Sequence, residues 1–138
     1  MLTKTGPLKV FVYGTLKPGE SNYRRYCEGK VADACPAIAI GELFALPAGY
    51  PAMTEGVGNV YGFMLTFSNN AILAALDRLE DYNPQHSPAK NLYQRQEIEL
   101  FDRDRQSLGT AWAYLMLRDR VQSLGGIPLP EGYWHRYS

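Results

Sequence analysis

Residues 70–82 form the one segment with the clear periodicity of an amphipathic helix, and strand-like segments lie on both sides of it. Ile72, Leu76 and Leu79 recur there at helical spacing and define an apolar face. A second, short helix is expected at 22–28. The predicted strands are rich in β-branched and aromatic residues and cover 8–13, 37–46, 60–67, 95–101 and 110–117. Short loops join most neighbouring strands, so we predict an α+β protein whose mostly antiparallel or mixed sheet can curl into a small β-barrel.

Composition excludes several classes of protein. The 138 residues suit a single domain spanning 1–138, and the 14 basic and 14 acidic residues balance, which gives no support for a nucleic-acid partner. No apolar run approaches the roughly 20 residues that span a bilayer, so we expect a cytoplasmic protein without a membrane partner. Cys27 and Cys35 form no CxxC pair and are expected to be reduced thiols. His86 and His135 are far apart, so no metal site is predicted. The neutral charge permits a monomer or weak homodimer.

Glu80 lies on the apolar face of the predicted helix. On a wheel of about 100° per residue it falls inside the apolar stripe, whereas Asp77 lies at the edge of the stripe and Asp81 faces away. A carboxyl group in apolar surroundings gains a raised pKa, which suits a general acid or base near neutral pH. A glutamate at a helix end can also reach solvent or pair with an arginine. Spacing alone therefore leaves a structural and a catalytic role evenly matched.

The loop Tyr13-Gly14-Thr15-Leu16-Lys17-Pro18-Gly19 follows a predicted buried strand. Successive backbone N–H groups just past a strand end can form an anion-binding nest, and Gly14 would permit the close approach of a ligand. A plain turn is the simpler interpretation of the pattern. A P-loop is excluded because Glu20 occupies the position that requires lysine, and Gly56-Val57-Gly58 lacks the third glycine of a dinucleotide-binding loop.

Tyr93 and Arg95 lie where a loop enters a predicted strand. They are either an ordinary edge-strand pair or residues that line the mouth of a pocket. No GxSxG motif supports a serine nucleophile, and nothing near Cys27 in the sequence marks a base that would activate its thiol.

Several of these motifs together resemble the γ-glutamylcyclotransferase-like family, which includes the γ-glutamylamine cyclotransferases and the AIG2-like proteins. The resemblance begins with Val12-Tyr13-Gly14-Thr15-Leu16, followed by Gly19 and Asn22. It continues in order through Gly41-Glu42-Leu43-Phe44, Tyr50-Pro51-Ala52, Val60-Tyr61-Gly62, Leu76-Asp77-Arg78-Leu79-Glu80, Tyr93-Gln94-Arg95 and Ala113-Tyr114. It therefore covers nearly the whole chain.

The resemblance implies a compact α+β fold around a small mixed β-barrel and a cofactor-free reaction on a small-molecule substrate. In such enzymes the α-amine of a γ-glutamyl compound attacks its own γ-carbonyl, which yields 5-oxoproline and a released amine or amino acid. The glutamate that matches Glu80 is the acid/base, and the loop that matches Tyr13 to Leu16 holds the α-carboxylate and amine. The predicted catalytic residue is Glu80, and the predicted substrate-binding residues are Tyr13, Gly14, Thr15, Leu16, Tyr93, Arg95 and Tyr114.

The chain departs from the family pattern after Glu80. Many members have a glycine and a short link there, whereas here Asp81 follows and a long loop leads to Tyr93. This loop is expected to border the leaving-group side of the pocket, so its length leaves the substrate open. The competing interpretation is a catalytically silent member that binds a small amino-acid derivative or a partner protein. Glu80 favours an enzyme, because a pocket that only bound an anionic ligand would gain nothing from a second negative charge.

Overall fold

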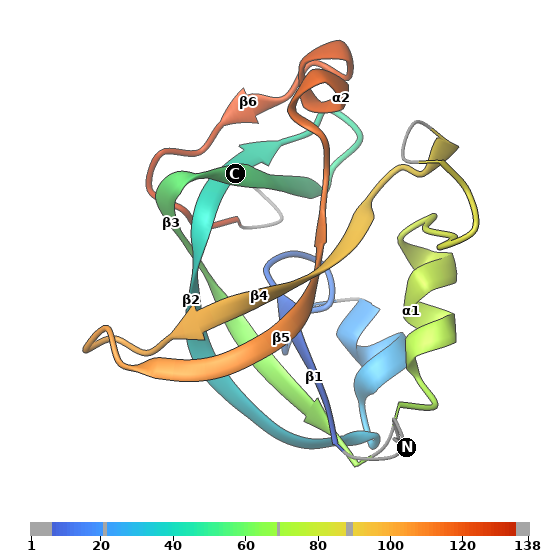
Figure 1. Cartoon of the computed structure of the whole chain (residues 1–138), viewed down its shortest axis with the longest axis vertical. Coiled ribbons are helices and arrows are strands. Elements are labelled where there is room, and N and C mark those ends of the chain that lie inside the picture. The colour runs from blue at the N-terminus through green and yellow to red at the C-terminus, as the bar shows by residue number, and fades with distance from the viewer. Residues whose placement is uncertain (1–6, 21, 69, 88–89, 135–138) are drawn as a thin grey trace.

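The computed structural model describes residues 7–20, 22–68, 70–87 and 90–134, and these form a curled sheet with helices packed beside it (Figure 1). The elements in chain order are β1 (Leu8–Val12), a π-helix (Tyr23–Cys27), β2 (Val31–Ala45), β3 (Pro51–Phe67), α1 (Leu73–Leu79), β4 (Gln94–Phe101), β5 (Ser107–Leu115), α2 (Arg118–Ser123) and β6 (Ile127–Pro128).

Within the described residues, six strands form one sheet in the order β3-β1-β5-β4-β2-β6. An additional pairing between β2 and β3 joins β2 back to the first strand of this order, so β1 to β5 close into a barrel. Closure is loose, because the backbone pairing between β1 and β5 is limited, among the described residues, to Val10 and Trp112. That contact is parallel and the other pairings are antiparallel. The prediction of an α+β fold with a small, mixed and mostly antiparallel barrel is confirmed.

The two longest strands, β2 and β3, bend around the barrel as a continuous hairpin (Figure 1). Their register shifts between Ile40 and Glu42, where an irregularity lets both strands change direction. Gly41 lies at this point, and a Cβ atom there would come within 2.6 Å of the Thr54 carbonyl oxygen. The close approach of two backbones therefore requires glycine at position 41.

The apolar core consists of two clusters, and β1 lies between them. Val10 and Val12 point into the cluster that also holds Leu76 of α1, whereas Phe11 points into the cluster that holds Met53. Both faces of β1 are thus buried, which explains why its sequence is a continuous apolar run rather than an alternation. The strand consequently ends deep inside the molecule, at the loop that the sequence singled out.

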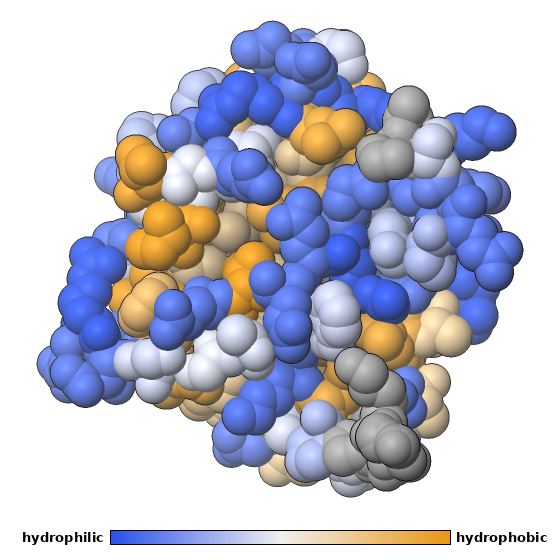
Figure 2. Space-filling model, in the orientation of Figure 1, coloured by the Kyte–Doolittle hydropathy of each residue, from blue (hydrophilic) through white to orange (hydrophobic). Residues whose placement is uncertain are grey.

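Helix α1 is shorter than the predicted 70–82, because it begins at Leu73 and ends at Leu79. Glu80 is its C-cap residue, and Asp81 follows with a φ of 54°, a left-handed conformation that stops the helix. Helix α2 and the two-residue strand β6 were not predicted. Figure 2 shows mainly hydrophilic side chains with a few apolar ones at the right of the view, where α1 lies, and a larger group of apolar side chains at the left. Among the described residues, none of the helices is sufficiently long and apolar to cross a membrane.

Candidate active site

A cavity of about 260 Å³ lies between α1, the loop after β1 and the beginnings of β3 and β4. Its lining combines apolar side chains with four tyrosines and a single carboxyl group. The residues are Phe11, Val12, Tyr13, Gly14, Thr15, Leu16, Asn22, Tyr50, Pro51, Leu79, Glu80, Leu92, Tyr93 and Tyr114. The structure therefore brings all of the predicted site residues together in one cavity except Arg95.

Glu80 reaches the cavity from the last turn of α1. Its backbone N–H donates to the Leu76 carbonyl at 3.0 Å, which holds the residue at the helix end. Its side chain makes no hydrogen bond or ion pair with any residue that the structure describes. Burial without a compensating partner raises the pKa of the Glu80 carboxyl from 4.5 to about 7. Near neutral pH the group is thus divided between its acid and base forms, as acid/base chemistry requires.

Three buried tyrosines wall the cavity around Glu80, and their hydroxyl groups are committed to the protein itself. The hydroxyl of Tyr13 donates to the Tyr114 carbonyl at 2.6 Å, and the hydroxyl of Tyr93 donates to the Pro51 carbonyl at 2.6 Å. The hydroxyl of Tyr114 donates to Asp77 Oδ1 at 2.6 Å. Burial is the main cause that raises the pKa of all three phenols, so they remain neutral. The three tyrosines therefore form part of the cavity wall and add no charge to it.

The loop after β1 presents unused backbone donors to the cavity. Its carbonyls are engaged, since Gly14 O accepts from Lys17 N at 3.0 Å and Thr15 O accepts from Asn22 N at 3.0 Å. Among the described residues, by contrast, no acceptor is present for the N–H groups of Gly14, Thr15 and Leu16. Successive free N–H groups beside a cavity make an anion-binding site. The bond from Lys17 N–H to the Gly14 carbonyl is that of an ordinary β-turn, so the loop is a turn with free N–H groups, and anion binding by these groups stays a prediction.

Gly14 has a packing role that the sequence did not reveal. A Cβ atom at this position would lie 2.7 Å from Pro51 Cγ, which is closer than two such atoms approach each other. The structure shows that Gly14 permits the close approach of β3, and its expected role in the approach of a ligand stays a prediction. The loop after β1 and the first residue of β3 can therefore share one wall of the cavity.

Arg95, the remaining predicted substrate-binding residue, does not line the cavity. Its Nη1 atom lies 2.5 Å from Asp77 Oδ2, and its guanidinium group lies over the rings of Tyr82 and Trp112, at 5.2 and 4.9 Å. This arrangement favours a positioning role over direct contact with substrate. Asp77, which we had placed at the edge of the helix stripe, is the residue that sequence reasoning missed. Its contacts with β4 and β5 depend on tertiary packing, and only its position within the Leu76–Glu80 motif hinted at them.

A second cavity, of about 490 Å³, lies on the other side of the loop after β1. Lys17 and the aromatic rings of Tyr61 and Tyr133 line it, and these two rings stack with centroids 4.6 Å apart. Lys17 is buried, and its Nζ donates to the Trp134 carbonyl at 2.6 Å. Burial lowers the pKa of this amine. In the described part of the chain, no group of three His, Cys, Asp or Glu side chains could hold a metal ion.

Comparison with known proteins agrees with this geometry. A family model described as gamma-glutamyl cyclotransferase, AIG2-like, matches residues 10–136, so the chain belongs to this family. A Vibrio cholerae protein whose name gives gamma-glutamylcyclotransferase as a provisional assignment is 34% identical over 109 residues, which is 77% of this chain and 79% of that protein. The gamma-L-glutamyl-butirosin B gamma-glutamyl cyclotransferase of Niallia circulans is 32% identical over 122 residues, covering 83% and 75% respectively.

The fold is shared with solved structures of more distant relatives. The crystal structure of an AIG2-like protein from Mus musculus superposes with a TM-score of 0.61 at 20% identity, and the match covers 80% of this chain and 78% of that one. At this level of identity the likeness shows the fold, whereas activity has to be argued from the site. This chain is therefore a member of the gamma-glutamyl cyclotransferase family, and it has the fold of the AIG2-like proteins.

Proposed function

We propose that this protein is a cyclotransferase that acts on a γ-glutamyl amine or γ-glutamyl amino acid, with Glu80 as its general acid/base. The products are 5-oxoproline and the released amine or amino acid. The observation that carries the proposal is a half-buried Glu80 carboxyl with a pKa of about 7, without a described partner, facing a cavity with free backbone donors. The relatives' names support the same reaction.

Substrate binding would use opposite charges at two places. The free N–H groups of Gly14, Thr15 and Leu16 would hold the α-carboxylate of the γ-glutamyl group. The neighbouring α-ammonium group would then face Glu80. Fixing both groups places the amine against the γ-carbonyl carbon, and such positioning of an intramolecular reaction can supply several kcal/mol of the barrier reduction, up to roughly 7–11 kcal/mol.

Two proton transfers would follow at one carboxyl group. Glu80 as carboxylate removes a proton from the α-ammonium, and the amine nitrogen forms a bond to the γ-carbon. The protonated Glu80 then gives that proton to the leaving nitrogen as the original C–N bond breaks. The ring nitrogen still carries one proton more than a neutral lactam, and it loses this proton to the released amine, which departs as an ammonium ion. A pKa of about 7 suits both directions, and acid/base catalysis of this kind commonly contributes about 10²–10⁴-fold. The steps need only proton transfer and an internal attack, so no cofactor or metal enters the scheme.

The charges of the cavity favour a γ-glutamyl amine as substrate. A γ-glutamyl amino acid carries a second carboxylate on its leaving group, and this carboxylate would need a cation. Among the described lining residues, Glu80 carries the only charge, and Arg95 is paired with Asp77 outside the cavity. A leaving group that is neutral or cationic therefore fits better. The loop from Asp81 to Tyr93 contributes Leu92 to the lining, which adds apolar surface.

The test is 5-oxoproline release from matched substrates. Purified protein would be incubated with γ-glutamyl amines, γ-glutamyl amino acids and glutathione, and 5-oxoproline would be quantified by mass spectrometry. We expect turnover, and we expect the γ-glutamyl amines to release 5-oxoproline faster than the γ-glutamyl amino acids. The absence of turnover with every substrate, together with thermal stabilisation by one of them, would instead support the binding-module alternative. We further propose a cytoplasmic monomer or weak homodimer, which fractionation and size-exclusion chromatography would check.

A further inference from the structure

Helix α1 carries two shielded carboxyl groups with opposite environments. Glu80 has no partner among the described residues, whereas both oxygens of Asp77 are used. Asp77 Oδ2 pairs with Arg95, and Asp77 Oδ1 accepts the Tyr114 hydroxyl. The two carboxyls are three residues apart and thus neighbours along one side of the helix end. Contacts that hold Asp77 in place therefore also hold the backbone at the end of α1, from which the Glu80 side chain enters the cavity.

The pair between Asp77 and Arg95 is well shielded. The side chains are only 14% and 16% exposed, and the aromatic rings of Tyr82 and Trp112 lie near the guanidinium group. Shielding strengthens the attraction relative to an exposed ion pair. The Nε atom of Arg95 is buried without a partner in the described region, so the guanidinium is held by its Asp77 contact and its aromatic neighbours.

Tyr114 connects this pair to the cavity wall. Its ring lines the cavity, its hydroxyl donates to Asp77, and its carbonyl accepts the Tyr13 hydroxyl. The contacts thus run from the loop after β1 through β5 to α1 and β4. Helix α1 has only seven residues and no side-chain N-cap, so its position depends on such tertiary contacts.

We propose that Asp77, Arg95 and Tyr114 form a positioning network for Glu80. The network holds the end of α1 against the sheet, and Arg95 compensates the charge of Asp77 so that Glu80 alone is uncompensated at the cavity. Arg95 and Asp77 are positioning residues, since neither lines the cavity. The kinetic part of this proposal rests on the proposed function. Its titration part does not, because the Glu80 carboxyl titrates with or without turnover.

The charged and titratable groups around Glu80 determine the direction in which each substitution should shift the pKa of its carboxyl group. Tyr13, Tyr93 and Tyr114 face it from the loop after β1, the start of β4 and β5, and all three are neutral at working pH. Asp77, on the same helix, and its partner Arg95 are the shielded charges nearby, whereas Arg78 and Asp81 beside Glu80 are exposed to solvent, which screens them. Loss of Arg95 leaves an uncompensated anion near Glu80, which disfavours the Glu80 carboxylate and raises its pKa. Loss of the Asp77 charge leaves an uncompensated cation, which lowers the pKa.

The experiment is a carboxyl-carbon NMR titration of protein labelled with ¹³C-glutamate, in which the Glu80 signal is assigned by its loss in Glu80→Gln. We expect Arg95→Met to raise the midpoint by about half a pH unit to one unit, and Asp77→Asn to lower it by a similar amount. The double variant should return close to the wild-type value. Arg95→Gln gives the same predicted sign if Arg95→Met does not fold.

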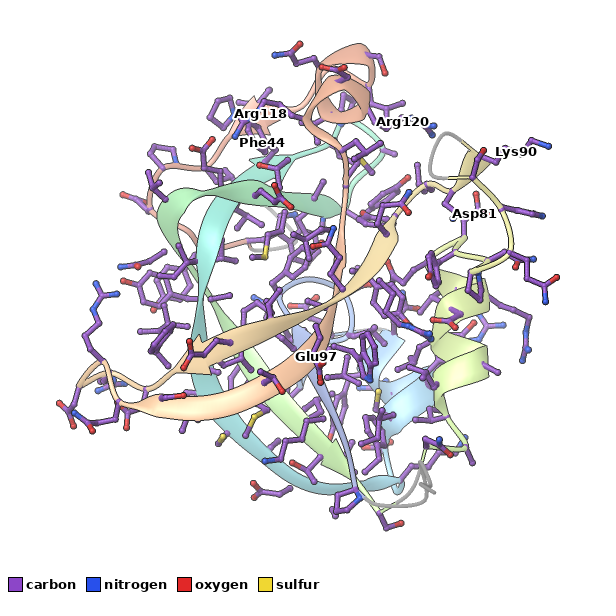
Figure 3. All side chains as sticks on the ribbon, viewed as in Figure 1. Phe44, Asp81, Lys90, Glu97, Arg118 and Arg120 are labelled. Atoms are coloured by element: carbon purple, nitrogen blue, oxygen red, sulfur yellow. The ribbon has the colours of Figure 1, made fainter. Side chains whose placement is uncertain are left out.

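Arg118→Met is the matched control. Arg118 also pairs with a carboxylate, Glu42 at 3.0 Å, but this pair is 48% and 40% exposed and lies near Phe44 at the other end of the molecule (Figure 3). We expect no change in the Glu80 midpoint from this variant. A purely structural role for Asp77 and Arg95 predicts a different result, since either loss would loosen the cavity, hydrate Glu80 and move both midpoints downward. Shifts in the same direction, or no shift in folded variants, would overturn the proposal.

Kinetics give the second readout. The acid limb of the kcat–pH profile should move with the titration midpoint, up for Arg95→Met and down for Asp77→Asn, while KM changes less than kcat. Arg95→Lys keeps the compensating charge and should hold the acid limb near its wild-type place. If the wild-type protein turns over none of the γ-glutamyl substrates, the proposed function fails. The directions in which the substitutions shift the Glu80 titration midpoint in the NMR experiment then still test whether the network exists.

Discussion

The two cavities described above differ in the ionisable side chain that each contains: Lys17 is buried and has a hydrogen-bond partner, whereas Glu80 is half-buried and has none among the described residues. Lys17 donates to the Trp134 carbonyl at 2.6 Å and lies 5.9 Å from the centroid of the Trp134 ring. Glu80 faces its cavity with no described partner. Burial disfavours the charged form of both side chains, but the hydrogen bond of Lys17 offsets part of this cost, whereas Glu80 has no such compensation, as is common for residues that take part in acid/base chemistry.

A single loop separates the two regions. Leu16 lines the cavity of Glu80, and Lys17, the next residue, lines the cavity of the stacked tyrosines. Substitutions in the two regions should therefore have opposite effects: at Glu80 they should lower activity and raise stability at neutral pH, and at Lys17 they should lower stability and leave activity nearly unchanged.

The largest expected effect is on turnover by Glu80→Gln. The amide keeps the shape of the side chain but cannot exchange a proton, so kcat should fall by about 10²–10⁴-fold, measured as 5-oxoproline release. Asp81→Asn is the matched control, because it removes an adjacent carboxylate that lies outside the cavity. Figure 3 shows Asp81 near Lys90, beside the end of α1. Near wild-type activity in Glu80→Gln, or a comparable loss in Asp81→Asn, would refute the assignment.

The same Glu80→Gln substitution should stabilise the fold at neutral and alkaline pH. The folded pKa of about 7 exceeds the ordinary 4.5, so the carboxyl imposes no penalty below about pH 4.5, and its penalty grows as the pH rises and is complete above about 7. We expect about 1–3 kcal/mol of added unfolding free energy at pH 8 and almost none at pH 4.5. Denaturant unfolding at the two pH values measures the difference. A pH-independent effect would mean that Glu80 is not titrating as proposed.

Lys17→Met should show the reverse pattern. It keeps the length of the side chain but leaves the Trp134 carbonyl without its donor, which should cost about 1–2 kcal/mol of unfolding free energy. Turnover at saturating substrate should stay within about twofold, because Lys17 does not line the Glu80 cavity. Thermal unfolding and 5-oxoproline release measure the two effects. If Lys17→Met lost turnover without losing stability, the proposed difference between the Lys17 and Glu80 regions would be wrong.

The smallest expected effect concerns the backbone next to Glu80. Asp81 has a φ of 54°, which aspartate and asparagine tolerate better than other non-glycine residues. Asp81→Ala should therefore lose about 0.5–1 kcal/mol of unfolding free energy, whereas Asp81→Asn should be neutral. Equal stability of the two variants would show that this conformation is not under strain. The comparison also measures the contribution of the helix end to stability separately from the acid/base role proposed for Glu80.

Local patterns predicted most of the fold. The apolar run of β1 and the alternation in β3 specified strands, because these preferences act over neighbouring residues. Helix α2 and strand β6 escaped prediction, because they are only six and two residues long and carry little periodicity. The end of α1 was also placed too late. It depends on the left-handed backbone of Asp81, at a position where no glycine announces it.

The candidate site was predictable in its parts but not in its roles. The helical wheel placed Glu80 on the apolar face, and the resemblance pointed to the loop after β1. Arg95 was assigned to substrate because it follows Tyr93 in a shared motif. Its true neighbour, Asp77, is 18 residues away in sequence. Gly14 was likewise linked to a ligand, although the atom that excludes a side chain there belongs to Pro51.

The sequence by itself determined the fold class and the family, and it led to the prediction that Glu80 moves protons. These follow from short-range periodicity and from residue types in a fixed order. The tertiary structure decided which charged groups are compensated, since a pKa depends on burial and on partners that lie far away in the chain. It gave Lys17 the Trp134 carbonyl and Asp77 the Arg95 guanidinium, while Glu80 received no partner among the described residues. That distribution of partners makes one acidic residue of α1 a candidate for chemistry and the other its support.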